Sequence, residues 1–275
     1  MIEFRSVSKE YPDGTAAVDD FSLVVPAHKT TVLVGSSGCG KTTLLRMVNR
    51  MVEPTAGTIE IDGEDILSRN AVELRRSIGY VMQNSGLLPH ITVIDNIATV
   101  PVLQGTPRRE ARERARELMD TVGLDASLAG RYPAQLSGGQ QQRVGVARGL
   151  AADPNILLMD EPFGAVDPIV RAELQNELIR LQEGLGKTII FVTHDIDEAL
   201  LLGDQIVILE KGAHIAQAGT AEEILAHPAS EFVASFVGSD RGSRALHVKN
   251  VDGKQVVVDG TGRLAGILSD GAGPS

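Results

Sequence analysis

The sequence of 275 residues has little of what several protein classes need. It contains one cysteine and no tryptophan, and only 3% of its residues are aromatic. A single cysteine cannot form an internal disulfide, so a buried core must hold the fold, and a chain of this length can build one. The scarcity of aromatic rings argues against the stacking surfaces with which proteins bind single-stranded nucleic acid.

Positive charge and long apolar runs are also scarce. The chain has 26 Lys and Arg against 36 Asp and Glu, a net charge of −10, which argues against sequence-independent binding to nucleic-acid phosphates. It lacks any run of about 18 apolar residues, the length that spans a bilayer. The first residues, MIEFRSVSKEY, do not resemble a secretory signal. We therefore expect a cytosolic protein that does not bind nucleic acid.

Two kinds of β pattern are present. Large apolar residues occupy alternate positions over 21–25, and Ile59–Ile61 runs into the turn pair Asp62-Gly63, which together predict a small antiparallel sheet. Three other runs consist almost entirely of apolar or β-branched residues, the pattern of strands buried on both faces of a parallel sheet. These runs are Thr31–Val34, Ile156–Met159 and Thr188–Thr193.

Helical patterns separate the predicted parallel strands. A helix is predicted over 106–124, with Thr106 as its N-cap and Pro107 in its first turn. Its buried face is expected to carry Ala111, Ala115, Leu118 and Val122. Strands alternating with helices indicate an α/β fold.

The composition changes after about Ser239, where glycine becomes frequent. Two strands are predicted over 255–258 and 263–268, around the turn pair Asp259-Gly260. We expect a linker over 238–245 and a frayed end over 270–275.

The first motif with a chemical meaning is a phosphate-binding loop, G-x4-G-K-[ST], between a predicted strand and a predicted helix. Glycines let backbone N–H groups surround phosphate oxygens, and the helix start adds its positive dipole end. Lys41 would reach the β- and γ-phosphates of a nucleotide, and the Thr42 hydroxyl would bind Mg²⁺. The residues expected to bind nucleotide here are Gly35, Ser36, Ser37, Gly38, Cys39, Gly40, Lys41, Thr42 and Thr43.

Two carboxylates follow the apolar run Ile156–Met159. Parallel α/β sheets bind ligands at the carboxyl ends of their strands, which is where Asp160 and Glu161 are expected to lie. Asp160 would complete the Mg²⁺ site, directly or through water. Glu161 is the candidate general base for the attacking water. The loop and this pair predict a nucleoside-triphosphate hydrolase.

A third motif, Leu136-Ser137-Gly138-Gly139-Gln140, precedes a predicted helix. With it the sequence resembles the ATP-binding-cassette (ABC) family, whose signature is LSGGQ. The resemblance implies a P-loop NTPase with a RecA-like core, an N-terminal antiparallel β subdomain and an inserted helical subdomain at about 85–150. In this family the signature residues Ser137, Gly138, Gly139 and Gln140 bind the ATP held by the other subunit, so a homodimer forms two composite sites.

Other positions match the family one by one. Gln83 fits the loop glutamine that senses Mg²⁺ and the attacking water and links to the membrane subunit. His194 fits the switch histidine that contacts the γ-phosphate. Tyr11 fits the aromatic residue that stacks on adenine, and Asp167 fits the loop that communicates across the dimer. For Cys39 two interpretations are open: a small residue that fits the loop, or a thiol whose oxidation inhibits the protein.

Several stretches narrow the resemblance to importers of osmoprotectants such as glycine betaine, choline and carnitine. These are 47–54, 83–101 and 163–171. The family implies integral-membrane permease subunits and a separate solute-binding protein as partners, ATP and Mg²⁺ as cofactors, and a peripheral position at the cytoplasmic face of the cell membrane. Import of another solute, such as an amino acid or a sulfonate, is the main alternative.

The resemblance assigns residues 1–237 to the ATPase domain and 238–275 to a linker and short tail. The tail resembles part of a cystathionine-β-synthase-type regulatory module, and a dimer-stabilising tail is the alternative. Three other functions are alternatives to transport. A soluble cassette for DNA repair would need a long coiled-coil insertion, a translation factor would carry two cassettes, and a non-hydrolysing nucleotide-gated module would not need Glu161 and His194.

Overall fold

The computed structural model describes residues 1–164, 166–238, 247–251, 254–258 and 264–267. Strands β1 (Ile2–Glu10), β2 (Ala16–Val25), β4 (Ala56–Ile61) and β5 (Glu64–Asp65) form an antiparallel sheet in the order β2-β1-β4-β5. The turn between β4 and β5 has φ values of 54° at Asp62 and 81° at Gly63, the left-handed pair of a tight hairpin. This confirms the antiparallel sheet expected from the sequence.

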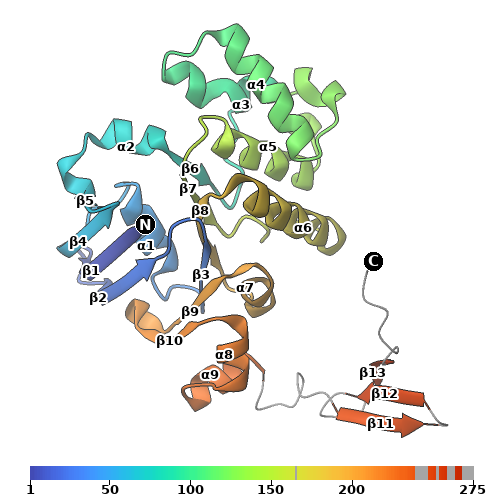
Figure 1. Cartoon of the computed structure of the whole chain (residues 1–275). Coiled ribbons are helices and arrows are strands. Elements are labelled where there is room, and N and C mark those ends of the chain that lie inside the picture. Colours follow the sequence, from blue (N-terminus) through green and yellow to red (C-terminus); the bar gives the residue numbers. More distant parts are fainter. Residues whose placement is uncertain (165, 239–246, 252–253, 259–263, 268–275) are drawn as a thin grey trace.

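A second sheet of six strands forms the centre of the molecule (Figure 1), in the order β10-β9-β3-β8-β7-β6. All its neighbours are parallel except β9 and β10. The three buried runs read from the sequence are β3, β7 and β8, and the structure adds β6, β9 and β10 to them. The bounds are β3 (Thr30–Gly35), β6 (Ile78–Val81), β7 (Ile156–Asp160), β8 (Thr188–Thr193), β9 (Gln205–Leu209) and β10 (Ile215–Gly219).

Consecutive residues of the parallel strands point into two different cores. In β3, Val32 and Val34 belong to the core under helices α5 (Gly138–Leu150), α6 (Pro168–Leu185) and α7 (Ile196–Leu202), whereas Leu33 faces α1 (Lys41–Val48) and the antiparallel sheet. The same alternation holds in β7 and β8. The parallel sheet is therefore covered on both faces, as its apolar sequence requires.

The helical region is inserted between β6 and β7 in the sequence and is seen at the top of Figure 1. It consists of α3 (Val93–Leu103), α4 (Arg108–Thr121), the 3-10 turns Ala126–Gly130 and Pro133–Gln135, and α5. The remaining helical segments are Ile66–Ser68, α2 (Ala71–Ser77), Lys211–Ala213, α8 (Ala221–Ala226) and α9 (Glu231–Phe236).

The expected N-cap of α4 was wrong by one residue. Pro107, not Thr106, is the N-cap, with φ −54° and ψ 134°. The ψ of Pro107 lies outside the helical range, so Pro107 is itself the flanking residue and the helix begins at Arg108. The residues expected on the buried face, Ala111, Ala115 and Leu118 among them, are each at most 2% exposed.

The C-terminal part contains a three-stranded antiparallel sheet of β11 (His247–Val251), β12 (Lys254–Val258) and β13 (Leu264–Ile267). The sequence predicted β12 and β13 and missed β11. The expected linker over 238–245, apart from Gly238, the turn at 259–260 and the expected frayed end lie outside the described residues. Among the described residues, no helix combines the length and apolarity that crossing a membrane requires.

Candidate functional site

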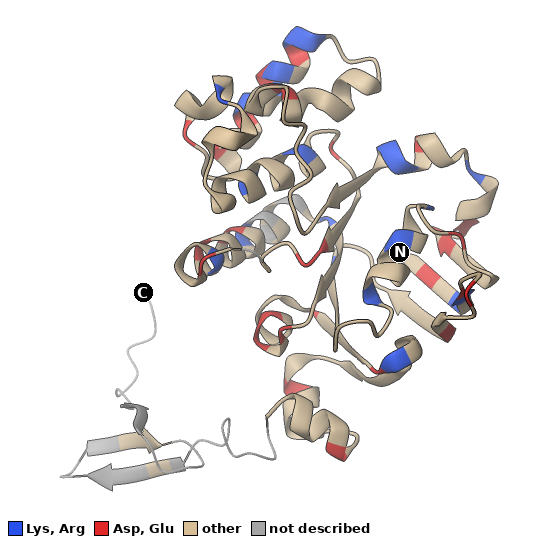
Figure 2. Cartoon of the chain, turned by 180° about the vertical axis from the view of Figure 1, so that it is seen from behind, with Lys and Arg blue, Asp and Glu red and all other residues tan. Residues whose placement is uncertain are grey.

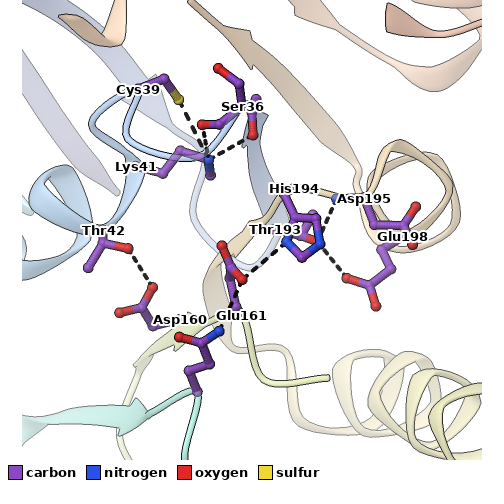
Figure 3. Close-up of polar contacts among 12 residues, drawn as sticks. Ser36, Cys39, Lys41, Thr42, Asp160, Glu161, Thr193, His194, Asp195 and Glu198 are labelled. Atoms are coloured by element: carbon purple, nitrogen blue, oxygen red, sulfur yellow. Dashed lines mark hydrogen bonds and ion pairs between the residues drawn. The ribbon is translucent and has the colours of Figure 1, made fainter. Parts of the chain in front are cut away.

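The candidate site lies where β3, β7 and β8 end at the same edge of the parallel sheet. Val34 of β3 pairs with Thr193 of β8, and Asp160 of β7 pairs with Val192. The loops that leave this edge therefore meet although they are far apart in the sequence. Figure 3 shows the side chains that they bring together.

The glycine-rich loop between β3 and α1 can only be built with glycine at critical positions. Gly38 and Gly40 have φ values of 79° and 113°, and a Cβ at Gly40 would collide with the carbonyl oxygen of Ala17. Gly40 is also the N-cap of α1, which therefore begins without a side-chain cap. An uncapped helix start offers its N–H groups to an anion.

Lys41 is only 4% exposed, and its ammonium group lies within the loop. Its Nζ donates to the carbonyl oxygens of Gly35 at 2.7 Å and Ser36 at 2.8 Å. Cys39 Sγ lies 3.6 Å from the same Nζ, and the side chain is 1% exposed. This burial supports the interpretation of Cys39 as a small residue that fits the loop.

A cavity of about 180 Å³ opens in front of the loop. Its wall combines the loop with the carboxylate of Glu161, a residue 118 positions beyond the last of the loop (161 − 43). The lining residues are Ala17, Ser37, Gly38, Gly40, Lys41, Thr42, Thr43 and Glu161. A phosphate chain placed here would touch both the backbone N–H groups and Glu161.

Asp160 is held on both oxygens. Thr42 Oγ1 donates to Oδ1 at 2.8 Å, and Tyr80 Oη donates to Oδ2 at 3.2 Å. Arg46 lies 3.8 Å from Oδ2. Burial of the ring, with the charge of Asp160 second, raises the pKa of Tyr80 to about 12, so its hydroxyl stays a donor at neutral pH. Sequence reasoning missed Tyr80 and Arg46.

The oxygen atoms of Thr42 and Asp160 suit Mg²⁺, which prefers oxygen ligands and keeps several waters or phosphate oxygens in its shell. Within the described residues, no three His, Cys, Asp or Glu side chains are placed to hold a metal ion by themselves. The pair Thr42 and Asp160 therefore fits a Mg²⁺ that shares its remaining positions with a bound nucleotide.

Glu161 is the point at which three loops meet. Its Oε2 accepts from Gln83 Nε2 at 3.3 Å and lies 3.1 Å from His194 Nδ1. Its φ is 44°, a left-handed value that is costly for a residue with a Cβ. The backbone is fixed there because Glu161 N donates to the carbonyl oxygen of Val192 at 2.9 Å and Gly164 N donates to that of Glu161 at 3.2 Å.

The loop after Gln83 is connected to helix α5 by Arg148, a partly buried arginine that sequence reasoning missed. The Arg148 guanidinium donates to the carbonyl oxygens of Ser85 at 2.6 Å and Gly86 at 2.7 Å. Burial lowers the pKa of Arg148 below its ordinary value. The sequence signal for this contact was an arginine among the small and apolar residues that α5 buries, such as Gly145, Ala147 and Gly149.

The structure does not bring the Ser137–Gln140 motif to this cavity; none of the four residues is part of its wall. The motif forms the start of α5, where Ser137 Oγ accepts from Gln140 N at 3.2 Å and Gln140 Oε1 accepts from Ser137 N at 2.9 Å. Gly139 faces Val170 of α6. Asp167 caps α6 by accepting from Ile169 N at 2.9 Å, so the motif and Asp167 lie beside each other.

Tyr11 follows β1 and is half-buried. The Lys9 ammonium lies 5.4 Å from the centre of its ring. Such a contact places a cation over one face of the aromatic ring.

Comparison with known proteins agrees with this geometry. A family model described as "ABC transporter" matches residues 18–164. The chain belongs to the ABC transporter family. The model covers the glycine-rich loop, the Ser137–Gln140 motif and the Asp160-Glu161 pair.

Curated relatives are similar over most of the chain. The choline transport ATP-binding protein OpuBA of Bacillus subtilis is 52% identical over 254 residues, which are 92% of this chain and 66% of that protein. The glycine betaine uptake system ATP-binding protein YehX of Escherichia coli is 50% identical over 252 residues, 91% of this chain and 81% of that protein. The chain thus spans slightly less than two thirds of OpuBA.

Solved structures share the fold. The dimeric structure of the ABC transporter cassette MJ0796 has a TM-score of 0.73 and 34% sequence identity, and covers 80% of this chain and 99% of that one. Another structure of MJ0796 is a dimer bound to ADP and Pi. CbiO1 of Clostridium perfringens has a TM-score of 0.75 and 30% identity over 82% of this chain and 90% of that one. The ABC cassette fold is therefore established.

Proposed function

We propose that this chain is the ATP-hydrolysing subunit of an ABC importer. The observation that carries the proposal is the convergence of Gln83 and His194 on Glu161, at the wall of the cavity in front of the glycine-rich loop. A carboxylate between an amide and an imidazole is placed to hold and deprotonate a water molecule beside a phosphate.

In this proposal Thr42 and Asp160 would hold Mg²⁺, which when bound would supply neutralisation of charge on the phosphate oxygens. Lys41 turns from the loop carbonyls toward the β- and γ-phosphates, exchanging two neutral acceptors for charged ones. Glu161 Oε2 accepts the proton of the attacking water. His194 contacts the γ-phosphate, and Gln83 senses Mg²⁺ and the attacking water.

The signature motif is assigned to the partner's nucleotide. Two chains would close head-to-tail over two ATP molecules, so that Ser137–Gln140 of one chain complete the cavity of the other. Its distance from the chain's own cavity supports this assignment, as does the dimeric state of MJ0796. Tyr11 would stack on adenine, and Asp167 would contact the partner beside the motif.

We assign the transport function to uptake of quaternary-amine osmoprotectants. The names of OpuBA and YehX, which specify choline and glycine betaine, support this class of solute. Permease subunits would span the membrane, and a separate binding protein would select the solute. The ATPase would lie peripherally at the cytoplasmic face. Lys and Arg share helices with Asp and Glu, as α4 shows (Figure 2), which supports the absence of a nucleic-acid partner.

For domain organisation we propose an ATPase domain over 1–237, with a helical subdomain at about 85–150, followed by a linker and tail. The tail would be a partial regulatory module or a dimer-stabilising element. Deleting residues 241–275 separates the two roles. A regulatory tail predicts a changed response of transport to salt, whereas a stabilising tail predicts an unchanged response.

The hydrolysis proposal is tested by phosphate release from ATP with Mg²⁺. The wild type should turn over, and Glu161→Gln should bind ATP but hydrolyse it about 10²- to 10⁴-fold more slowly. Glu222→Gln, at an exposed glutamate of α8, is the matched control and should match the wild type. A Glu161→Gln variant with wild-type turnover would remove Glu161 from the role of base.

The solute is tested by uptake of labelled glycine betaine in cells that carry the chain with its permease and binding protein. Uptake that is lost in the Glu161→Gln variant supports the assignment. Uptake of an amino acid instead of a quaternary amine would contradict the solute class and leave the ATPase assignment intact.

A further inference from the structure

A second carboxylate lies behind the hydrolytic site. Glu198, in the first turn of α7, is 6% exposed and accepts two hydrogen bonds. Thr193 Oγ1 donates to its Oε2 at 2.6 Å, and Gln175 Nε2 of α6 donates to its Oε1 at 3.2 Å. Arg171 Nε, also on α6, lies 4.0 Å from Oε1. Glu198 therefore joins the end of β8 to α6.

The two neighbours of His194 are held by this arrangement. Thr193 Oγ1 donates to Glu198 and accepts from the backbone N–H of Asp195 at 3.0 Å. Asp195 Oδ2 lies 3.8 Å from Arg171. Figure 3 shows Thr193, His194, Asp195 and Glu198 side by side. The backbone that carries His194 is thus fixed on both sides, whereas the exposed imidazole is itself held toward Glu161.

Helix α6 gives this cluster a connection to the signature motif. α6 begins directly after Asp167, and its Val170 faces Gly139. Arg171 is the next residue of the same helix, and Gln175 follows one turn later. A shift of α6 at its first turn would therefore move the groups that hold Glu198.

We propose that Glu198 is a positioning residue for ATP hydrolysis. Through its bond with Thr193 it holds the His194 imidazole in place beside Glu161. Through Gln175 and Arg171 it makes the position of the imidazole depend on α6. The proposal rests on the proposed ATPase function and deepens it. Burial of a carboxylate costs free energy because it removes water from the charged group, so Glu198 needs the hydrogen-bond partners that surround it. Burial raises the pKa of Glu198, while the bond from Thr193 lowers it.

The experiment is a double-mutant cycle with purified full-length chain, measuring kcat and KM for ATP in the presence of Mg²⁺. Glu198→Ala should lower kcat about 10-fold and change KM less than about 3-fold, because the glycine-rich loop is untouched. In a His194→Ala background it should have almost no further effect on kcat. A role in stability alone predicts the same 10-fold loss in both backgrounds, which would overturn the proposal.

Thr193 supplies a milder matched pair should Glu198→Ala fail to fold. Thr193→Val keeps the shape and removes the hydroxyl, and it should reproduce the loss of kcat. Thr193→Ser keeps the hydroxyl and should stay within about 3-fold of the wild type. Equal rates for the Val and Ser variants would overturn the proposal.

The result also separates this proposal from the function on which it rests. A wild-type chain without ATPase activity would overturn both. An active chain in which His194→Ala and Glu198→Ala act independently would overturn only the role of Glu198.

Discussion

Helices α1 and α5 both begin at a glycine-containing motif, and they differ in how that start is satisfied. α1 begins at Gly40 without a side-chain cap, inside the cavity wall formed with Glu161. α5 begins at Ser137, whose hydroxyl and the Gln140 side chain cap it reciprocally. Both motifs place backbone N–H groups at a helix start. Those of α1 have no side-chain cap, whereas α5 has a side-chain capping box.

This difference teaches why one motif can act alone and the other cannot. The start of α1 lies beside the pair proposed to hold Mg²⁺, with Thr42 Oγ1 2.8 Å from Asp160, so under the proposed function a single chain would bind nucleotide by itself. The start of α5 is exposed and already capped. Under the proposed head-to-tail closure, a phosphate from the partner's side must replace or extend that cap, which makes hydrolysis depend on the second copy.

The largest effect is expected from a change in the glycine-rich loop at the start of α1. Lys41→Ala should lower hydrolysis about 10³-fold and weaken ATP binding, because the ammonium group in the cavity wall is removed. Calorimetric ATP titration and phosphate release measure both. Lys211→Ala, at an exposed lysine, is the control and should match the wild type. Unchanged ATP affinity in Lys41→Ala would contradict the account of the loop.

The next largest effect is expected from a change in the motif at the start of α5. Ser137→Ala should lower hydrolysis about 10²-fold and leave ATP binding by the single chain unchanged, because the motif lies outside the chain's own cavity. Ser230→Ala is a matched control, since Ser230 caps α9 by accepting from Val233 N at 3.2 Å. Both variants should lose about 1 kcal/mol of stability, and only the first should lose turnover. Equal turnover in the two variants would contradict the assignment of the motif.

A smaller effect is expected on the Mg²⁺ dependence of hydrolysis at the α1 site. Tyr80→Phe removes the donor to Asp160 Oδ2 and should raise the Mg²⁺ concentration for half-maximal hydrolysis about 3- to 10-fold. Binding of Mn²⁺ with nucleotide, followed by electron paramagnetic resonance, should weaken similarly. Tyr132→Phe, at an exposed tyrosine, serves as control. No change in either metal measurement would remove Tyr80 from the metal site.

The smallest effect on activity comes from the framework that carries α5. Arg112 donates to both oxygens of Asp95, at 2.8 and 2.9 Å, and so joins α4 to α3. Asp95→Asn should lower the free energy of unfolding by about 1–2 kcal/mol and leave hydrolysis within about twofold. Asp120→Asn, at an exposed aspartate of α4, is the control.

The pH dependence of this effect has a definite sign. The hydrogen bond from Arg112 lowers the pKa of Asp95 to about 2 in the folded chain, against about 3.9 in an unfolded one. The stabilisation is present above pH about 4 and is lost as the pH falls toward 2. Urea unfolding at pH 7 and pH 3 should show the difference between wild type and Asp95→Asn shrink. A difference that grows at pH 3 would contradict the role of the ion pair.

The sequence was sufficient where local pattern and sheet topology determine the result. The meeting of Thr42 and Asp160, 118 positions apart, follows from the rule that parallel strands end at one edge. The antiparallel sheet follows from alternation and from Asp62-Gly63. The predicted start of α4 was wrong by one residue because Pro107 adopts an extended ψ of 134°, which a fixed proline φ does not determine.

The remaining contacts depend on side-chain directions that no spacing shows. Tyr80 reaches Asp160 because β6 pairs with β7, and β6 was not predicted as a strand. Glu198 reaches Thr193 because α7 turns back over β8. Arg148 reaches the loop after Gln83 because α5 packs against that loop. The contacts of Tyr80 and Arg148 join elements that only the folded structure makes neighbours, whereas the contact of Glu198 with Thr193 is local in the sequence.

The central claim is that the start of α1 binds nucleotide within one chain, whereas the start of α5 acts on the partner's nucleotide. The most direct test is sedimentation of the Glu161→Gln variant with and without ATP. The account predicts a monomer without ATP and a dimer with it. Adding Ser137→Ala to Glu161→Gln should leave a monomer that still binds ATP. A double variant that dimerises as readily as Glu161→Gln, or a double variant that loses ATP binding, would contradict the account.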